Sequence, residues 1–566
     1  MSYRAPQMEV QMPVSRSRSV LLVVALVGLL ALPAAVEAHP PSSGSSGSAP
    51  RSGPATGSLP GTTGPCTKQA AKSMPDGRGH DHLDITQHRF QCNARLAFFD
   101  PLLDELDEGI FGAQDAILGE IDIENDVLAI AVAFPESGVL FYDVQNPAEP
   151  EFIGWYRSSQ CEELVFDVDC GAYVDLSEDG TVAFLSLQDI SVLPQQPPDA
   201  GVLPVTVPGV EVIDVDSPVG PTRTQIYPLA SGIGGTHTSN SHVIPADADD
   251  TDPRAPGEYL FSVKNVNALH ISEVNRVGGV PFLTPVSEIE LDELHDMYID
   301  NDPLTGRTYV YIAGGFATGF YVYDVTDPAQ PEFLGEWDPT PECAEDWYGH
   351  TTFTVVRNGR RYVTIDAELF GGGGEFGEQS AEDQAEGCGR LVGNGDRPGP
   401  LWIVDATNFE NLQRGANPTD GEESGQVAQE LKQASLEALV STWTNPAGRA
   451  AGNIEFSPHN QQVVGNRIYL SHYHGGVYQL DATAAFAGES TRPREMAFVV
   501  PHNEPIRPLY EPMITDPLIP FIAEFFQARP TVWDTLFYKG FVIIVDSTGG
   551  LYSYKFGKAA AQRQKG

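Results

Sequence analysis

Positive charge is scarce in this sequence. Its 566 residues carry 33 Lys and Arg against 77 Asp and Glu, a formal net charge of −44. A surface of that sign repels phosphate backbones and anionic membrane surfaces, so we do not expect nucleic acid as a partner. The acidic surface instead favours solubility, cation binding or a saline environment.

Familiar catalytic and nucleotide-binding motifs are also missing. The sequence has no GxSxG, HExxH or P-loop pattern, no GxGxxG followed by a helical pattern, and no CxxC pair. Acidic pairs such as Asp104 with Glu108 occur, but nothing places them across a cleft as glycosidase catalysis requires. The sequence therefore assigns no catalytic residue and leaves enzyme activity open.

Apolar runs long enough to span a membrane are absent. The run at 20–32 follows Arg16 and Arg18 and precedes small residues up to Ala38. Thirteen residues span about 20 Å as a helix, whereas a bilayer core is about 30 Å thick. We therefore predict a signal peptide at 1–38, with a signal anchor as the alternative. The expected location is secreted, extracellular or cell-surface associated, with no integral membrane segment after cleavage.

Cysteines are few but even in number, as disulfides in an exported chain require. Six cysteines allow 15 complete pairings, and proximity in the sequence favours three loops. The absence of CxxC pairs makes a cysteine-bound metal the weaker interpretation. The favoured pairs are Cys66 with Cys92, Cys161 with Cys170, and Cys343 with Cys388.

Long amphipathic helical patterns are almost absent, and short apolar runs alternate with turn clusters instead. This pattern is typical of all-β sandwiches, barrels and propellers. Ser, Gly and Pro dominate the segment that precedes these runs, which predicts a flexible linker. The predicted organisation is a linker at 39–79, a folded domain at 80–558 and a tail at 559–566.

An internal repeat selects among the all-β folds. FYDVQNPAEPEFIGWY at 141–156 and VYDVTDPAQPEFLGEW at 322–337 share nine of sixteen positions, and weaker copies occur elsewhere. Such a repeat indicates stacked copies of one small unit. Seven units of about four strands each can be traced, which predicts a seven-bladed β-propeller of four-stranded blades with irregular insertions.

Two structural predictions follow from the repeat. The last unit offers only three strands, so the free apolar strand at 93–99 is expected to supply the fourth and close the ring. Asp143 and Asp324 in the repeated phrase are expected to accept backbone N–H bonds where a strand turns. Pro147 and Pro328 are then expected to end the strand pairing.

Histidines begin the first strand of four consecutive units. In a propeller the first strand of every blade lines the central channel, so histidines in one register converge around the axis. Neutral imidazole is a ligand for zinc, copper and iron. A structural role and a metal-free binding pocket are the alternatives. The four residues are His242, His295, His350 and His459.

The loop between the second and third strands of each unit returns to the same face of the ring. Carboxylates and further imidazoles from these loops can complete a metal-binding sphere. The loop residues and nearby histidines are His472 and His474 in the sixth unit, Glu368 in the fifth, His237 ahead of the third, and His80, His82 and His88 ahead of ring closure.

The repeated apolar-apolar-Asp-Val-x-x-Pro phrase resembles the LVIVD-repeat proteins of bacterial and archaeal surfaces. The stretches that carry the likeness are FYDVQNPAEP, EVIDVDSP, YVYDVTDPAQP and LWIVDATN. This resemblance implies a secreted or surface β-propeller.

A fainter likeness connects NRIYLSHYHGGVYQLDAT at 466–483 and the strands led by His295 and His459 to the selenium-binding-protein and methanethiol-oxidase group. That resemblance implies a propeller with a histidine-bound metal. Carried over, it makes His242, His295, His350 and His459 metal ligands, joined by His472 or His474.

Together these patterns predict an exported propeller with a histidine-rich site at the central channel. The site is expected to bind a transition metal (copper, iron or zinc) or a small-molecule ligand, with metal-dependent oxidation of a small molecule as its activity. The alternative is a non-catalytic extracellular or cell-surface interaction scaffold. Its acidic rim and insertions would contact a partner protein or a polysaccharide.

Overall fold

The described part of the chain consists almost entirely of β-strands. All of it belongs to one unit, Pro41–Gly566. No helix within these segments is long and apolar enough to cross a bilayer. The computed structural model describes residues 64–70, 90–102, 117–134, 137–160, 170–189, 208–217, 220–229, 234–246, 256–264, 267–291, 293–315, 318–338, 348–368, 399–409, 412, 434, 436–446, 457–502 and 529–557.

Tight two-residue turns fold successive strands back on one another. The turn between the strands β3 (Ile117–Glu124) and β4 (Val127–Phe134) consists of Asn125 and Asp126, with φ values of 47° and 71°. Asn358 and Gly359, at 55° and 75°, connect β19 (Tyr348–Arg357) to β20 (Arg360–Glu368). Two-residue hairpins that match the twist of their strands require positive φ, which Asn, Asp and Gly tolerate best. The polar turn clusters of the sequence thus form hairpins.

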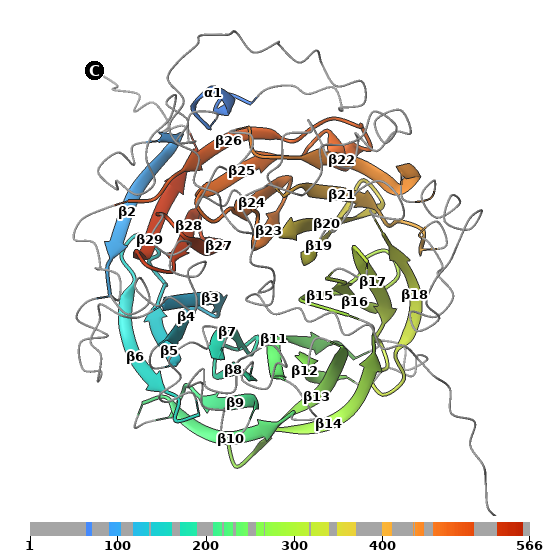
Figure 1. The fold of residues 1–566 in the computed structure, drawn as a ribbon. Helices are drawn as coiled ribbons and strands as arrows, with labels where there is room; N and C mark the ends of the chain where they lie inside the picture. Colours follow the sequence, from blue (N-terminus) through green and yellow to red (C-terminus); the bar gives the residue numbers. More distant parts are fainter. Residues whose placement is uncertain are drawn as a thin grey trace, which may run out of the picture. The chain divides into compact units, whose positions relative to one another are not determined.

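Three sheets are antiparallel meanders of four strands in sequence order (Figure 1). The first contains β3 (Ile117–Glu124), β4 (Val127–Phe134), β5 (Gly138–Asp143) and β6 (Glu151–Arg157). The second contains β15 (Met297–Asn301), β16 (Thr308–Ala313), β17 (Phe320–Asp324) and β18 (Glu332–Trp337). The third contains β19 (Tyr348–Arg357), β20 (Arg360–Glu368), β21 (Leu401–Asp405) and β22 (Leu439–Trp443).

The ring closes with a strand from each end of the chain. The last sheet contains β27 (Val532–Tyr538), β28 (Phe541–Asp546) and β29 (Gly550–Phe556), and β2 (Ala94–Asp100) pairs with β29 as its fourth strand. This confirms the closing role predicted for 93–99. Hydrogen bonds between β2 and β29 thus join the two ends of the folded chain within one sheet.

A second N-terminal segment joins the sheet that comes before the closing sheet in the sequence. That sheet contains β23 (Gln461–Val464), β24 (Arg467–Ser471), β25 (Val477–Asp481), β26 (Arg494–Val499) and a short fifth strand, β1 (Gln91–Cys92). A 3₁₀ helix, η4 (Ala485–Ala487), lies between β25 and β26, and the helix α1 (Thr67–Ala70) contacts β26.

The predicted disulfide between Cys66 and Cys92 is present and fixes this piece. The Cys66 N–H also donates to the Glu495 carbonyl at 3.2 Å. The predicted linker at 39–79 therefore includes a segment that is part of the folded domain. The side chains of the other two predicted cysteine pairs lie outside the described residues.

Six hydrogen-bonded sheets account for the described strands, where the sequence predicted seven of four strands each. The difference lies in one sheet of eight strands. In it, Gly234 and Gly235 of β11 pair with Asp189 and Gln188 of β8, which joins two meanders. The strands are β7 (Cys170–Leu176), β8 (Val182–Asp189), β9 (Gly209–Asp214), β10 (Thr222–Pro228), β11 (Gly234–Ile244), β12 (Gly257–Lys264), β13 (Ala268–Val277) and β14 (Val280–Glu290).

Glycine permits the close approach of β8 and β11. Gly235 has φ of +63°, and a Cβ atom there would lie 2.3 Å from the Leu187 carbonyl oxygen. Only glycine adopts this conformation without strain and leaves room for the neighbouring backbone. The result is an all-β propeller whose sheets surround a central axis, with the first strand of each meander innermost (Figure 1).

The aspartates of the repeated phrase stop strands, as predicted. The Gln145 N–H donates to Asp143 Oδ1 at 2.7 Å, and the Thr326 N–H donates to Asp324 Oδ1 at 2.9 Å. Apolar side chains pack between adjacent sheets, as where Trp337 of β18 meets Trp402 of β21 at 5.5 Å between ring centroids. The repeats thus set the frame that positions the innermost strands.

Candidate metal centre

Four histidines from consecutive innermost strands form a stacked arc. His237 lies in β11 and His350 lies in β19, whereas His295 and His459 lie two residues before β15 and β23. The ring centroids of His237 and His295, of His295 and His350, and of His350 and His459 are each 4.3 Å apart. All four side chains are buried, none more than 3% exposed. The equal spacing reflects one imidazole from each strand at the same level.

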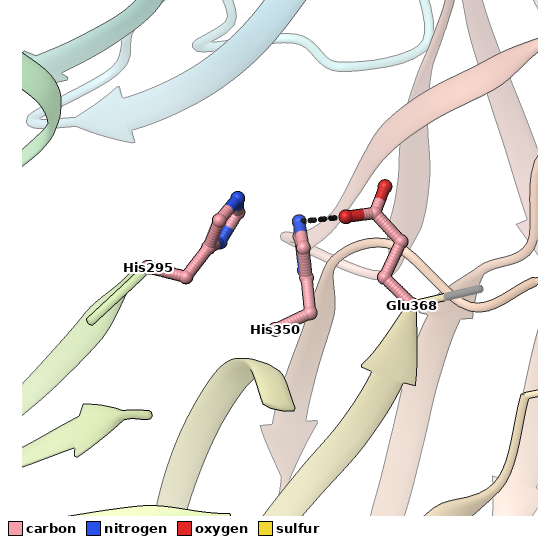
Figure 2. Close-up of side chains that lie close together, drawn as sticks. All are labelled: His295, His350 and Glu368. Atoms are coloured by element: carbon pink, nitrogen blue, oxygen red, sulfur yellow. Dashed lines mark ion pairs between the residues drawn. The ribbon is translucent and has the colours of Figure 1, made fainter. Parts of the chain in front are cut away.

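Glu368 adds a carboxylate to this arc. It ends β20, the second strand of its meander, which returns to the face where His350 begins its strand. Glu368 Oε2 lies 3.4 Å from His350 Nε2 (Figure 2). Glu368 Oε1 lies 3.8 Å from His459 Nε2. Three ligand atoms lie within 4.8 Å of one another, one each from His295, His350 and Glu368. No other such group of three occurs in the described part of the chain.

Short contacts connect Gln188 with the first two imidazoles of the arc. Gln188 Oε1 accepts from His237 Nδ1 at 2.8 Å, so the proton of neutral His237 is on Nδ1. His237 Nε2 and His295 Nε2 lie 2.8 Å apart. His295 Nδ1 is buried and has no hydrogen-bond partner among the described residues.

The other two imidazoles also present a bare nitrogen. The Trp533 carbonyl accepts from His459 Nδ1 at 2.7 Å, which leaves the lone pair on Nε2. His350 Nδ1 bonds to the Thr351 hydroxyl at 2.7 Å. Neither Nε2 has a hydrogen-bond partner within the described segments, although both are fully enclosed. Buried polar atoms without partners are costly and need an explanation.

Burial keeps these imidazoles neutral. It lowers the pKa of His295 and of His459 to about 3, and it lowers the pKa of His237 and His350 well below the usual value. The neighbouring imidazoles lower the pKa of His237 and His350 further. Neutral imidazole is the form that binds metal.

Aromatic residues enclose the cluster. The Tyr473 hydroxyl donates to Glu368 Oε1, and the Tyr473 ring lies 4.9 Å from His459. Tyr173 and Tyr348 pack on His237 and His295 with centroid distances of 4.4 Å and 5.0 Å. These rings exclude water from the imidazole arc, and Tyr473 orients the carboxylate.

The arrangement fits a transition metal. At zinc–ligand distances of about 2.0–2.2 Å, two ligands of a tetrahedral ion lie about 3.3–3.6 Å apart. The 3.4 Å between His350 Nε2 and Glu368 Oε2 matches that edge. A mixed imidazole and carboxylate donor set suits zinc, copper or iron. The bare nitrogens of His295, His350 and His459 are oriented for ligation by their other hydrogen bonds or neighbours.

The structure brings together three of the six histidines predicted as ligands, namely His295, His350 and His459. His242 is five residues further along β11 than His237, which occupies the register predicted for His242. His242 faces Asn301, Glu178 and Asp300 instead. The strand begins at Gly234, earlier than the sequence analysis placed it.

Neither loop histidine belongs to the group of ligand atoms that lie within 4.8 Å of one another. His472 packs against Trp443 and Tyr478, each at 5.8 Å between centroids. His474 is buried in the turn after Tyr473. The side chain that this loop sends to the cluster is therefore the tyrosine between the two predicted histidines. His80, His82 and His88 lie outside the described residues.

His237 was predicted only as an additional histidine ahead of the third unit, and the roles of Gln188 and Tyr473 were not predicted. A signal for His237 was present, because Thr-His-Thr at 236–238 parallels Gly-His-Thr at 349–351. Gln188 carries no such signal. It reaches His237 through the pairing of β8 with β11, which joins strands of different repeats.

No family model matches the chain, and no curated protein matches it. Similar solved structures include the β-propeller domain of Vanderwaltozyma polyspora Nup133, at 7% identity over 82% of this chain and 97% of that one, with a TM-score of 0.42. BamB from Moraxella catarrhalis is similar at 10% identity over 77% and 94%, with a TM-score of 0.36. The propeller assignment itself stands on the strand pairing.

Proposed function

We propose that this protein binds a transition metal at the imidazole arc, with His295, His350 and Glu368 as its central ligands and His459 and His237 beside them. The observation that carries the proposal is the set of buried, unpartnered imidazole nitrogens around one carboxylate. A bound copper, iron or zinc ion would supply Lewis acidity, and copper or iron would also supply redox chemistry.

The surrounding residues have defined tasks in this proposal. Gln188 and the Trp533 carbonyl hold imidazole protons on Nδ1 of His237 and His459, so that Nε2 points inward. Tyr473 holds its phenolic proton against Glu368. We further propose metal-dependent oxidation of a small molecule as the activity, which rests on the likeness to the methanethiol-oxidase group.

We also propose a blade count of seven and export of the protein. Counting the eight-stranded sheet as two blades joined by the β8–β11 contact gives seven blades, each with one innermost strand. The Cys66–Cys92 disulfide suits an oxidising compartment and, with the N-terminal signal pattern, supports export.

Metal analysis tests the proposed site. The purified protein is loaded separately with copper, iron and zinc, desalted, and analysed by mass spectrometry. We expect about one tightly bound equivalent of one metal per chain. The His295→Ala and His350→Ala double variant should lose it. His242→Ala is the matched control, since it removes a predicted ligand that the structure places elsewhere, and it should retain the metal.

Two results would overturn the site. One is the absence of bound metal in the wild type after all three loadings. The other is equal metal content in the wild type and the double variant, with circular dichroism confirming that both are folded.

Oxygen uptake tests the proposed activity. Small thiols are the first substrates to try, because of the likeness to the methanethiol-oxidase group. We expect uptake by the metal-loaded wild type and its loss in the double variant. Uptake that is equal in both would contradict the assignment of activity to this site.

A further inference from the structure

A second polar region occupies the central channel next to the imidazole arc. It is a cavity of about 490 Å³ lined by the innermost strands β3, β7, β11, β15, β19, β23 and β27. This space is large enough to hold several ordered water molecules. The cavity starts one residue beyond the imidazole arc on the same chain segments, because its lining residues Asp296 and Thr351 directly follow His295 and His350.

The cavity is strongly acidic. Eight carboxylates line it, and its lining includes no Lys or Arg. Its single basic side chain is His242, whose pKa burial lowers despite the opposing effect of Glu178 and Asp300. The other six carboxylates are those of Glu120, Asp122, Glu124, Asp175, Asp296 and Asp534.

Three of these carboxylates also connect neighbouring strands. Asp534 accepts from the Ile121 N–H at 3.1 Å, and Asp122 accepts from the Leu176 N–H at 2.8 Å. Asp175 accepts from the Ser241 N–H at 2.7 Å. These bonds link consecutive innermost strands and explain an aspartate at each position on structural grounds.

Glu120 and Glu124 have no such structural role. Glu120 accepts one hydrogen bond, from Asn460 Nδ2 at 3.3 Å. No hydrogen bond or ion pair to the Glu124 carboxyl group occurs within the described residues, and burial followed by repulsion from Asp122 raises its pKa to about 8. Both side chains add a carboxyl group to a site whose lining has no Lys or Arg, and a bound cation would favour their ionised form.

Gln461 supplies an independent sign of a ligand. Its side chain lines the cavity and is only 6% exposed. Its Nε2 donates to the Thr351 carbonyl at 2.9 Å, but Oε1 has no partner in the described segments. Amide oxygens are ligands of the hard-oxygen type, and this one belongs to a side chain that lines the acidic cavity.

We propose that this cavity binds a hydrated divalent cation of the Mg²⁺ type, a site distinct in chemistry from the imidazole arc. The donors are all oxygens, which suits hard cations. Among the described residues, no three of these carboxylates hold ligand atoms within 4.8 Å of one another, so they do not form a ready inner coordination shell. Mg²⁺ loses water reluctantly and keeps several waters when bound, and the cavity has room for them.

Calorimetric titration with MgCl₂ and with hexaamminecobalt(III) tests this site in the full chain, at physiological salt and after removal of metals by chelation. The cobalt complex mimics hydrated Mg²⁺ because it does not exchange its ligands. We expect both to bind at one competing site. The Glu120→Gln and Glu124→Gln double variant should weaken binding at least about tenfold, because the shape is kept while two charges are removed.

Two sets of controls define the outcome. Glu149→Gln with Glu151→Gln removes the same charge from exposed positions and should leave binding unchanged. The His295→Ala and His350→Ala variant should also bind Mg²⁺ as the wild type does, so failure of the imidazole site and failure of this cavity are separable.

The proposal is overturned if no saturable binding occurs, or if the cavity variant and the surface control bind equally. Binding of spermidine without Mg²⁺ or the cobalt complex would overturn the metal-ion assignment in favour of an organic cation. Anomalous diffraction from crystals of the unmodified protein soaked in hexaamminecobalt(III) needs no variant. A peak in the cavity supports the site, and its absence opposes it.

Discussion

Glu368 is the side chain that links the imidazoles to one another. It approaches His350 and His459 with different oxygens and accepts a hydrogen bond from Tyr473. A single carboxylate thus faces two bare imidazole nitrogens and is oriented by a phenol. Carboxylates placed in this way stabilise a bound cation and fix its position.

Glu368→Gln should weaken metal binding by at least about tenfold, because the amide keeps the size but loses the negative charge. Tyr473→Phe removes only the orienting hydrogen bond and should cause a smaller loss. Competition with a chromophoric chelator measures both affinities. If Glu368→Gln binds metal as tightly as the wild type while His350→Ala does not, the carboxylate is not a ligand.

The histidines show how far single residues are predictable from sequence. His295, His350 and His459 were found because each begins the first strand of a repeat. His242 was chosen over His237 because the start of β11 was placed too late, and a five-residue shift moves a side chain along the channel. Gln188 and Tyr473 depend on contacts between different repeats, and no local pattern encodes such contacts.

At the scale of elements, the N-terminal segment is joined to the ring in two ways. β2 pairs with β29, and the Cys66–Cys92 disulfide holds α1 and β1 on the sheet of β26. The closing strand was predictable because the last repeat lacks a fourth strand. The docking of α1 was not, since four residues after a Ser/Gly/Pro-rich stretch give no periodic signal.

Replacing both cysteines of this disulfide by serine should lower the free energy of unfolding by about 3 kcal/mol. The reason is that the bond closes a loop with a sequence separation of 26, which restricts the unfolded chain. Denaturant unfolding of the oxidised wild type and the double variant measures the difference. Added reductant should destabilise the wild type by more than the variant, because only the wild type has this bond to lose. Equal unfolding midpoints in all samples would contradict a stabilising role.

Across the whole molecule, two sets of buried groups change stability in opposite directions with pH. Burial lowers the pKa of His295 and His459 to about 3. Below the unfolded value of about 6.5, the unfolded chain therefore binds more protons, and stability falls as the pH drops. Burial raises the pKa of Asp296 to about 6, of Asp534 to about 7 and of Glu124 to about 8. The folded chain then binds more protons above about pH 4, and stability falls as the pH rises.

The metal-free protein should accordingly be most stable between about pH 4 and pH 6.5, where the two effects offset each other. Thermal unfolding in chelator across pH 3–9 measures this directly. Glu124→Gln removes one of the raised carboxylates and should stabilise the protein near pH 8 by about 1 kcal/mol, a value kept small because the side chain retains solvent contact. A stability maximum at pH 8 or above would contradict the burial of these carboxyl groups close to one another.

A metal at the imidazole arc is the central feature proposed for this protein, and anomalous diffraction from metal-loaded crystals tests it most directly. We predict one strong peak among His295, His350 and Glu368, about 2.0–2.2 Å from His350 Nε2 and from a Glu368 oxygen. A peak beside His472 and His474 with none at the arc, or no peak in a fully loaded crystal, would contradict it.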